Sequence, residues 1–95
     1  MKPIKSVGIV VVDKQKVLLV KHGPSADHFE DKYGIPSGKL LHGETNIQTA
    51  VRELKEESGL TTFPKNLKPL HLFKATFNTK KGLLSYDWQT YHCLS

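Results

Sequence analysis

Four glutamates lie close together in the middle of the chain, at Glu44, Glu53, Glu56 and Glu57. The last three are three and four positions apart, so their side chains are neighbours if the segment is an α-helix. Like charges at this spacing destabilise a helix unless a cation neutralises them. Carboxylate oxygens suit Mg²⁺, Mn²⁺ or Ca²⁺, and the sequence has no His or Cys spacing that suggests zinc. The cluster therefore indicates a hard divalent metal and, through it, a phosphate-bearing substrate.

A solvated helix face is the alternative interpretation of the same glutamates. Helix faces rich in Glu are common on protein surfaces, and Arg52 and Lys55 are suited to ordinary surface ion pairs. Glu56 and Glu57 taken alone favour this simpler interpretation, whereas the spacing of the whole segment favours the metal site.

The residues around the glutamates predict the helix that would hold them. Thr45 and Gln48 have the spacing of a capping box, in which the two side chains satisfy early backbone N–H groups. Gly59 is a natural stop because glycine accepts the left-handed conformation that ends many helices. A helix from about 45 to about 58 is therefore expected, with one apolar face. That face consists of Ile47, Ala50, Val51 and Leu54.

A longer pattern covers the glutamates and the glycines on either side of them. It reads Gly, five residues, Glu, seven residues, then Arg-Glu-apolar-x-Glu-Glu-x-Gly-apolar. Nine specified positions make chance agreement very unlikely, and the segment resembles the signature of the Nudix hydrolase family. Tyr33-Gly34-Ile35-Pro36 resembles the lead-in of that family, which often has Trp in place of Tyr33 and Gly in place of Ser37. The nine positions are Gly38, Glu44, Arg52, Glu53, Leu54, Glu56, Glu57, Gly59 and Leu60.

The resemblance implies an α+β fold with a Nudix-type mixed β-sheet and the catalytic helix at about 45–58. Complete relatives are α/β/α sandwiches whose second helix, at the C-terminus, packs on the other face of the sheet. Nothing in this sequence supplies that helix, so we expect a single Nudix-like domain over 1–95 that is shortened at its C-terminus and lacks it. A second copy that completes the sheet as a homodimer is one way to cover what remains exposed.

Apolar runs and alternation indicate where the strands of this sheet lie. The segment 23–32 is polar and contains Gly and Pro, so it is expected to be a loop at the lip of the substrate site. Strands are expected at about 7–12, 17–22, 70–77 and 83–94.

The resemblance also implies roles for single residues. Glu53, Glu56 and Glu57 would be the main ligands of Mg²⁺ or Mn²⁺, with Glu53 or Glu57 as the general base. The backbone carbonyl of Gly38 would be a further ligand, since glycine lets the chain approach an ion closely. Glu44 would support the metal, directly or through water.

Arg52 completes the set of catalytic residues that the resemblance implies, together with the three helical glutamates. It would pair with a carboxylate and hold it in orientation around the metal. An ordinary ion pair with Glu56, four positions later, is the simpler interpretation, and both can hold.

The reaction implied by the resemblance is attack of water on a phosphorus of a diphosphate bridge. We therefore expect a Mg-dependent pyrophosphohydrolase acting on a nucleoside triphosphate or similar nucleoside diphosphate derivative. A catalytically weak Nudix-like module that binds a nucleotide or an RNA end is the alternative. Phe73 and Phe77 are able to stack on a base, but their alternating strand favours packing in the core. The candidate substrate contacts are Phe29, Tyr33, Lys39 and Asn78.

Charge and composition restrict the possible partners and compartment. The formal net charge is +5, and thirteen of the fourteen basic residues are scattered lysines, which suits attraction of polyphosphates better than sequence-specific nucleic-acid binding. The single Cys93 rules out an internal disulfide and is typical of a reducing compartment, so a cytoplasmic location is expected. No segment approaches the roughly 18 apolar residues of a membrane span, so no membrane partner is expected.

Overall fold

The structure, a computed structural model, describes residues 2–21 and 33–94 of the chain. The mixed sheet and the helix that the sequence predicts are both present. Among the described residues, no helix is both long and apolar enough to cross a membrane. In chain order the elements are β1 (Ile4–Asp13), β2 (Lys16–Val17), β3 (Val20–Lys21), β4 (Tyr33–Gly34), β5 (Ser37–Lys39), α1 (Asn46–Ser58), the 3₁₀ helix η1 (Pro64–Asn66), β6 (Leu67–Thr79) and β7 (Gly82–Leu94).

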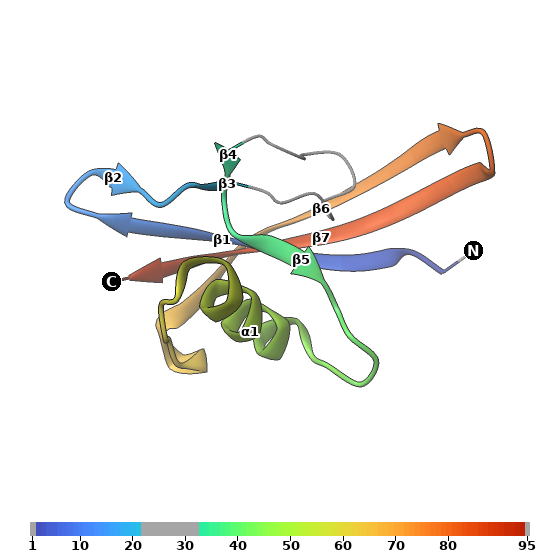
Figure 1. Cartoon of the computed structure of the whole chain (residues 1–95). Coiled ribbons are helices and arrows are strands. Elements are labelled where there is room, and N and C mark those ends of the chain that lie inside the picture. Colours follow the sequence, from blue (N-terminus) through green and yellow to red (C-terminus); the bar gives the residue numbers. More distant parts are fainter. Residues whose placement is uncertain (1, 22–32, 95) are drawn as a thin grey trace.

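Strand β1 lies at the centre of the main sheet. It pairs in parallel with β7, from Ile4 opposite Tyr86 to Val12 opposite Leu94. Its other edge is shared by β5 and β2, which pair antiparallel with the early and late parts of β1 respectively. Strand β6 pairs antiparallel with β7, so the strand order is β2-β1-β7-β6. The β6–β7 hairpin extends well beyond α1 (Figure 1).

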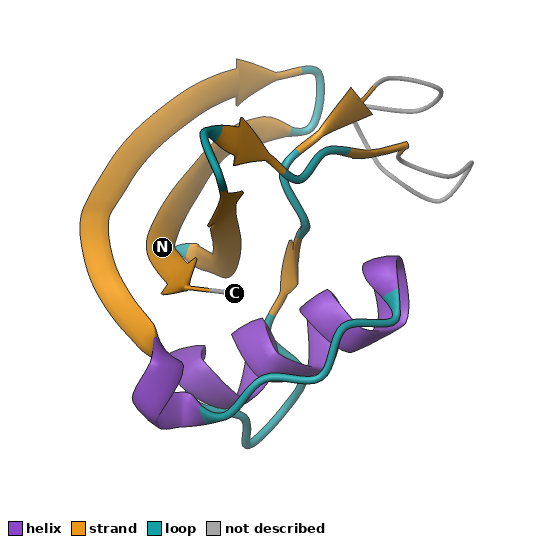
Figure 2. Ribbon diagram, turned by 90° about the vertical axis from the view of Figure 1, so that its left-hand side faces the viewer, coloured by secondary structure: helices purple, strands orange, loops and turns teal. Residues whose placement is uncertain are grey.

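The predicted strand at 17–22 is divided between two sheets. Lys14 and Gln15 have positive φ angles and form a tight turn that pairs β2 with the end of β1. The chain follows β1 only as far as Leu18, whose N–H donates to the Val11 carbonyl at 2.9 Å, because Pro36 and β5 occupy the edge of β1 at residues 6–9. It leaves instead to form β3, which pairs with β4 on the side of β1 opposite α1 (Figures 1 and 2). Expectations for the 23–32 loop concern residues outside those that the structure describes.

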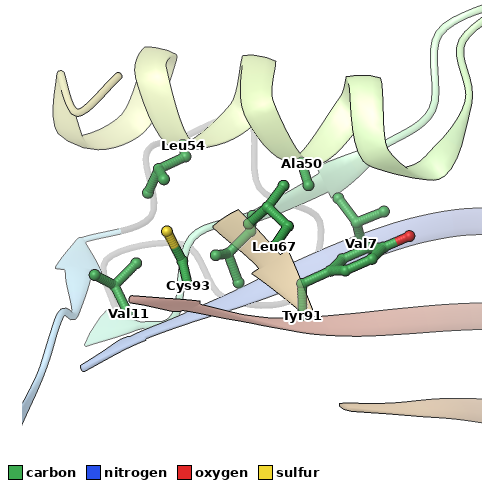
Figure 3. Packing of buried hydrophobic residues seen from close by; sticks show 8 residues of the cluster. Val7, Val11, Ala50, Leu54, Leu67, Tyr91 and Cys93 are labelled. Carbon is green, nitrogen blue, oxygen red and sulfur yellow. The ribbon is translucent and has the colours of Figure 1, made fainter. Parts of the chain in front are cut away.

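Helix α1 covers one face of the sheet and forms the core with it. Alternate residues of β1 point towards the helix and are buried against its apolar face (Figure 3). Leu67 at the start of β6 and two residues of β7 complete the cluster. The buried apolar side chains are Val7, Ile9, Val11, Ala50, Leu54, Leu67, Tyr91 and Cys93.

Both ends of α1 are as predicted. At the start, the Gln48 backbone N–H donates to Thr45 Oγ1 at 3.2 Å, and the Thr45 N–H donates to Gln48 Oε1 at 2.9 Å. At the end, Gly59 has a φ of 80° and its N–H donates to the Lys55 carbonyl. The capping box and the glycine stop therefore fix the helix bounds by local interactions.

The expectation that Phe73 and Phe77 pack in the core is wrong. These residues are 48% and 54% exposed, because their register with β7 places them on the face of the sheet that α1 does not cover. Phe73 instead contacts Trp88 across the strand pair, with ring centroids 5.6 Å apart. Pro69 lies within the same strand beside a bulge, which is tolerated because β6 is at the edge of the sheet.

Gly8 makes room for Trp88 on the face of β1 opposite the helix. A Cβ at Gly8 would lie 2.7 Å from the indole Cζ2 and 3.0 Å from Ile35 Cδ1. Ile35 belongs to the segment that leads into β5. The next residue, Pro36, is held to β1 by a hydrogen bond of 2.9 Å from the Ile9 N–H to the Pro36 carbonyl. Trp88 and Gly8 therefore help to fix the chain that leads into β5.

We predict that Gly8→Ala lowers the free energy of unfolding by about 1–3 kcal/mol, because the added methyl group overpacks the contact with Trp88 and Ile35. Urea unfolding is the measurement. In a Trp88→Leu background the same substitution is expected to cost clearly less, since the indole is gone. An equal cost in both backgrounds would contradict the assignment of the strain to the indole.

Candidate metal and catalytic site

The carboxylate of Glu53 lies directly against the backbone of Gly38. Helix α1 crosses beside β5, and a Cβ at Gly38 would overlap the carboxyl carbon and both oxygens of Glu53. Gly38 itself is fixed by its pairing with Val7 of β1. The absence of a side chain at Gly38 thus lets a helical glutamate reach the sheet edge, which brings together two positions that the motif separates by fourteen residues.

Arg52 connects three of the four motif glutamates. Its guanidinium donates to Glu44 through Nε–Oε2 at 2.7 Å and Nη2–Oε1 at 2.9 Å. Its Nη1 donates to Glu53 Oε1 at 2.6 Å and to Glu56 Oε2 at 3.2 Å. The predicted pair with Glu56 is present, but Glu56 is 58% exposed and the contact is the longest of the ion pairs that Arg52 makes with these three glutamates. The main partners of Arg52 are therefore Glu44 and Glu53.

Glu44 closes the loop that joins β5 to α1. In addition to the two bonds from Arg52, its Oε1 accepts from the Leu41 N–H at 2.8 Å. The hydrogen bonds from Arg52 and then from Leu41 lower the pKa of Glu44 from 4.5 to about 2. Glu44 is consequently an ionised carboxylate whose oxygens are already heavily hydrogen-bonded.

Glu53 and Glu57 have the opposite electrostatic character. Burial raises the pKa of Glu53, against the effect of Arg52. Burial also raises the pKa of Glu57, with a further contribution from the neighbouring Glu53 carboxylate, although the Ser37 N–H donates to Glu57 Oε1 at 2.8 Å and acts against the rise. Two adjacent, partly buried carboxylates with raised pKa values form a place where a cation would be stabilising.

The chemistry of these donors fits a hard divalent ion. Carboxylate and carbonyl oxygens are the usual ligands of Mg²⁺ and Mn²⁺. In the described part of the chain, no three His, Cys, Asp or Glu side chains are already grouped as ligands. Arg52 Nη1 donates to one oxygen of Glu53 and to one oxygen of Glu56, so each carboxylate can be oriented by the guanidinium through that oxygen.

The predicted substrate contacts are spread over the molecule. Lys39 follows Gly38 in β5, and its carbonyl accepts from Arg52 Nη2 at 3.2 Å. Tyr33 is exposed in β4, on the other side of β1 from the helix (Figure 1). Asn78 pairs with Leu83 beside the turn of the β6–β7 hairpin, which points away from α1. Phe29 lies outside the described residues, and a substrate role for all four stays a prediction.

Two groups at the site escaped prediction from the sequence. The Ser37 N–H holds Glu57, and a backbone donor leaves no trace in the residue type. Thr49 is fully buried, and its hydroxyl lies 2.9 Å from Glu44 Oε1. A polar residue inside the apolar face of the predicted helix, next to Ala50, was the available signal for Thr49.

We predict that Glu57→Gln raises the thermal midpoint by a few degrees at pH 7 in buffer with EDTA. The folded-state pKa of Glu57 is raised, so ionised Glu57 disfavours the fold once the pH exceeds its ordinary value of 4.5. Below that pH the residue is protonated in both states and the gain is expected to disappear. Gln keeps an acceptor for the Ser37 N–H.

Thermal unfolding at pH 7 and pH 4 measures this effect. Glu56→Gln is the matched control, because Glu56 is exposed, and no comparable gain is expected for it. A midpoint for Glu57→Gln at or below that of the unsubstituted protein at pH 7 would contradict a raised pKa.

Comparisons with known proteins give the family and the fold of this chain. The family model for the NUDIX domain matches residues 2–93. The 8-oxo-dGTP diphosphatase of Escherichia coli K12 is 38% identical over 56 residues, which are 59% of this chain and 43% of that protein. The chain thus spans less than half the length of this curated relative.

Solved structures show the same fold. A MutT/nudix family protein from Enterococcus faecalis aligns with a TM-score of 0.79 and 25% identity, over 99% of this chain and 37% of that one. A NUDIX hydrolase from Nitrosomonas europaea aligns with 0.72 and 26%, over 99% and 61%. The NUDIX domain of Shewanella oneidensis NrtR, complexed with ADP ribose, aligns with 0.74 and 23%, over 100% and 62%, a likeness of fold alone. With the family model covering nearly the whole sequence and its motif folded around Gly38, this chain belongs to the Nudix family.

Proposed function

We propose that this chain hydrolyses the diphosphate linkage of a nucleoside diphosphate derivative, such as a nucleoside triphosphate, with Mg²⁺ or Mn²⁺. The observation that carries the proposal is the contact of Glu53 with Gly38, with Glu57 beside it and Arg52 bound to it. The similarity to the 8-oxo-dGTP diphosphatase of Escherichia coli supports a nucleotide as the class of substrate.

Glu53, Glu56 and Glu57 would hold the metal ion, with the carbonyl of Gly38 as a further ligand. When bound, the ion supplies polarisation of phosphoryl oxygens and a lowered pKa of water. The protein positions the carboxylates: the Ser37 N–H orients Glu57, and the absence of a side chain at Gly38 lets Glu53 approach the edge of the sheet.

One of the two partly buried carboxylates, Glu53 or Glu57, would act as the general base. Burial raises the pKa of both Glu53 and Glu57, which brings each closer to the range of an effective general base at neutral pH. Glu53 or Glu57 accepts the proton of the attacking water, and both remain candidates. Arg52 keeps Glu53 and Glu56 in the vicinity of the site and Glu44 ionised.

Release of phosphate or pyrophosphate tests the proposed function. The panel contains nucleoside triphosphates, nucleotide sugars, dinucleoside polyphosphates and capped RNA, each with Mg²⁺ or Mn²⁺. We predict that Glu56→Gln lowers turnover of the accepted substrate by at least about 100-fold, because loss of a residue that only supports a metal ligand already costs about 10–100-fold.

Asp13→Asn is the matched control, because it also removes an exposed carboxylate but at the far end of β1. Full turnover by folded Glu56→Gln would overturn the assignment of this residue. Absence of turnover on the whole panel by the unsubstituted chain would overturn the hydrolase function for residues 1–95.

We further predict that Gly38→Ala lowers metal affinity and turnover by about 10–100-fold. The methyl group would overlap the Glu53 carboxylate, which is the end of a flexible side chain and can swing away without unfolding the protein. The thermal midpoint is therefore expected to change little. Titration with Mn²⁺ and the hydrolysis assay measure the loss, and Ser37→Ala, which keeps its N–H, is the neighbouring control. Unchanged Mn²⁺ affinity in Gly38→Ala would remove Gly38 from the site.

An aromatic surface, exposed at Phe73 and Phe77 and half-buried at Tyr86 and Trp88, favours a second candidate function, binding of a nucleotide or RNA end without turnover. This surface consists of Phe73, Phe77, Tyr86 and Trp88, with ring centroids 5.6 Å apart for Phe73–Trp88 and 5.8 Å for Phe77–Tyr86. Bases stack on aromatic side chains of this kind. Salt-dependent binding of a short RNA without product would identify this function. Self-association seen by sedimentation would instead assign the surface to a second copy.

A further inference from the structure

Thr49 is a polar residue on the buried, apolar face of α1. It lies in α1 beside Ala50, and both are completely buried. Its Oγ1 lies 3.1 Å from the Thr45 carbonyl, the usual acceptor for a helical threonine, and 2.9 Å from Glu44 Oε1. The hydroxyl has one proton to donate, and an ionised carboxylate is a stronger acceptor than a carbonyl. Donation to Glu44 is therefore the favoured bond.

Glu44 accepts hydrogen bonds from three residues, and Thr49 is the one of them that is completely buried. The Leu41 N–H belongs to an exposed loop residue, and Arg52 is a long side chain. Thr49 is β-branched and buried within the helix, so its hydroxyl has little freedom. The hydrogen bond from this hydroxyl connects Glu44 directly to α1.

The orientation of Glu44 determines that of Arg52. Nε and Nη2 of the planar guanidinium both contact the Glu44 carboxylate, at 2.7 and 2.9 Å. This two-point contact fixes the plane of the guanidinium and therefore the direction of Nη1. Nη1 is the atom that donates to Glu53 at 2.6 Å and to Glu56 at 3.2 Å. A change in the orientation of Glu44 would therefore also change the orientation of Glu53 and Glu56.

We propose that Thr49 is a positioning residue of this site: its buried hydroxyl orients Glu44 and, through Arg52, the glutamates that hold the metal. This inference rests on the proposed function where it concerns catalysis. A purely structural role is the competing explanation, in which the Thr45 carbonyl alone satisfies the hydroxyl and only the methyl group of Thr49 matters for packing.

Three substitutions separate these explanations. Thr49→Val keeps the shape and removes the hydroxyl, and Thr49→Ser keeps the hydroxyl and removes the methyl group. Thr49→Ala removes both and favours the helix, which provides a second hydroxyl-free protein. Thr62→Val is the matched control, because Thr62 is also buried but its hydroxyl contacts Cys93 Sγ at 3.4 Å instead of a carboxylate.

We predict that Thr49→Val and Thr49→Ala weaken Mn²⁺ binding and lower kcat by about tenfold, with KM changed less. The Arg52 Nε–H signal in a ¹⁵N spectrum of the metal-free protein is expected to shift and to exchange faster with water. Thr49→Ser is expected to remain close to the unsubstituted protein in all three measurements, and Thr62→Val to leave them unchanged.

The proposal is overturned if Thr49→Val binds Mn²⁺ normally and leaves the Arg52 signal in place. It is also overturned if Thr49→Ser is as impaired as Thr49→Val, because the methyl group would then be the important part. If the unsubstituted protein hydrolyses nothing, the proposed function fails, while Mn²⁺ binding and the Arg52 signal still decide the role of Thr49.

Discussion

The approach of α1 to β5 at Gly38 sets the position of everything else in the site. The helix can bring the Glu53 carboxylate against the sheet only because residue 38 has no side chain. The same helix must bury Ala50 and Leu54 against β1 and β7, so its distance from the sheet is fixed by the core. The position of α1 therefore determines both the packing of the core and the placement of the acidic residues. The capping box determines at which residue this helix begins.

The four glutamates divide into two groups with different electrostatic surroundings. Glu44 is ionised and neutralised by Arg52, and its hydrogen bonds close the loop before α1. Glu53 and Glu57 are partly buried beside each other, and burial raises the pKa of both. A single arginine cannot neutralise both groups, so negative charge remains concentrated between α1 and β5. The part of the site organised by Arg52 and the part suited to a cation are therefore adjacent but distinct.

Features encoded by neighbouring residues were predictable from the sequence. Thr45, Gln48 and Gly59 defined the helix because caps are local interactions. The division of 17–22 into β2 and β3 was not predictable, since it depends on β5 occupying the edge of β1. The exposure of Phe73 and Phe77 was missed for a similar reason: alternation shows that a strand has two faces, but not which face another element covers. The Ser37 N–H at Glu57 left no signal because it belongs to the backbone.

The parallel pairing of β1 with β7 has a consequence for the order of folding. The paired residues of the two strands are ~80 positions apart in the chain, so bringing them together costs loop entropy. The hydrogen bonds between β1 and β7 are therefore expected to form late in folding. The β6–β7 hairpin and α1 need only local contacts and can form first. During synthesis β1, apolar on both faces between Val7 and Val12, has to wait for its central partner β7 to leave the ribosome. That interval is when the chain is most exposed to aggregation and has most need of a chaperone.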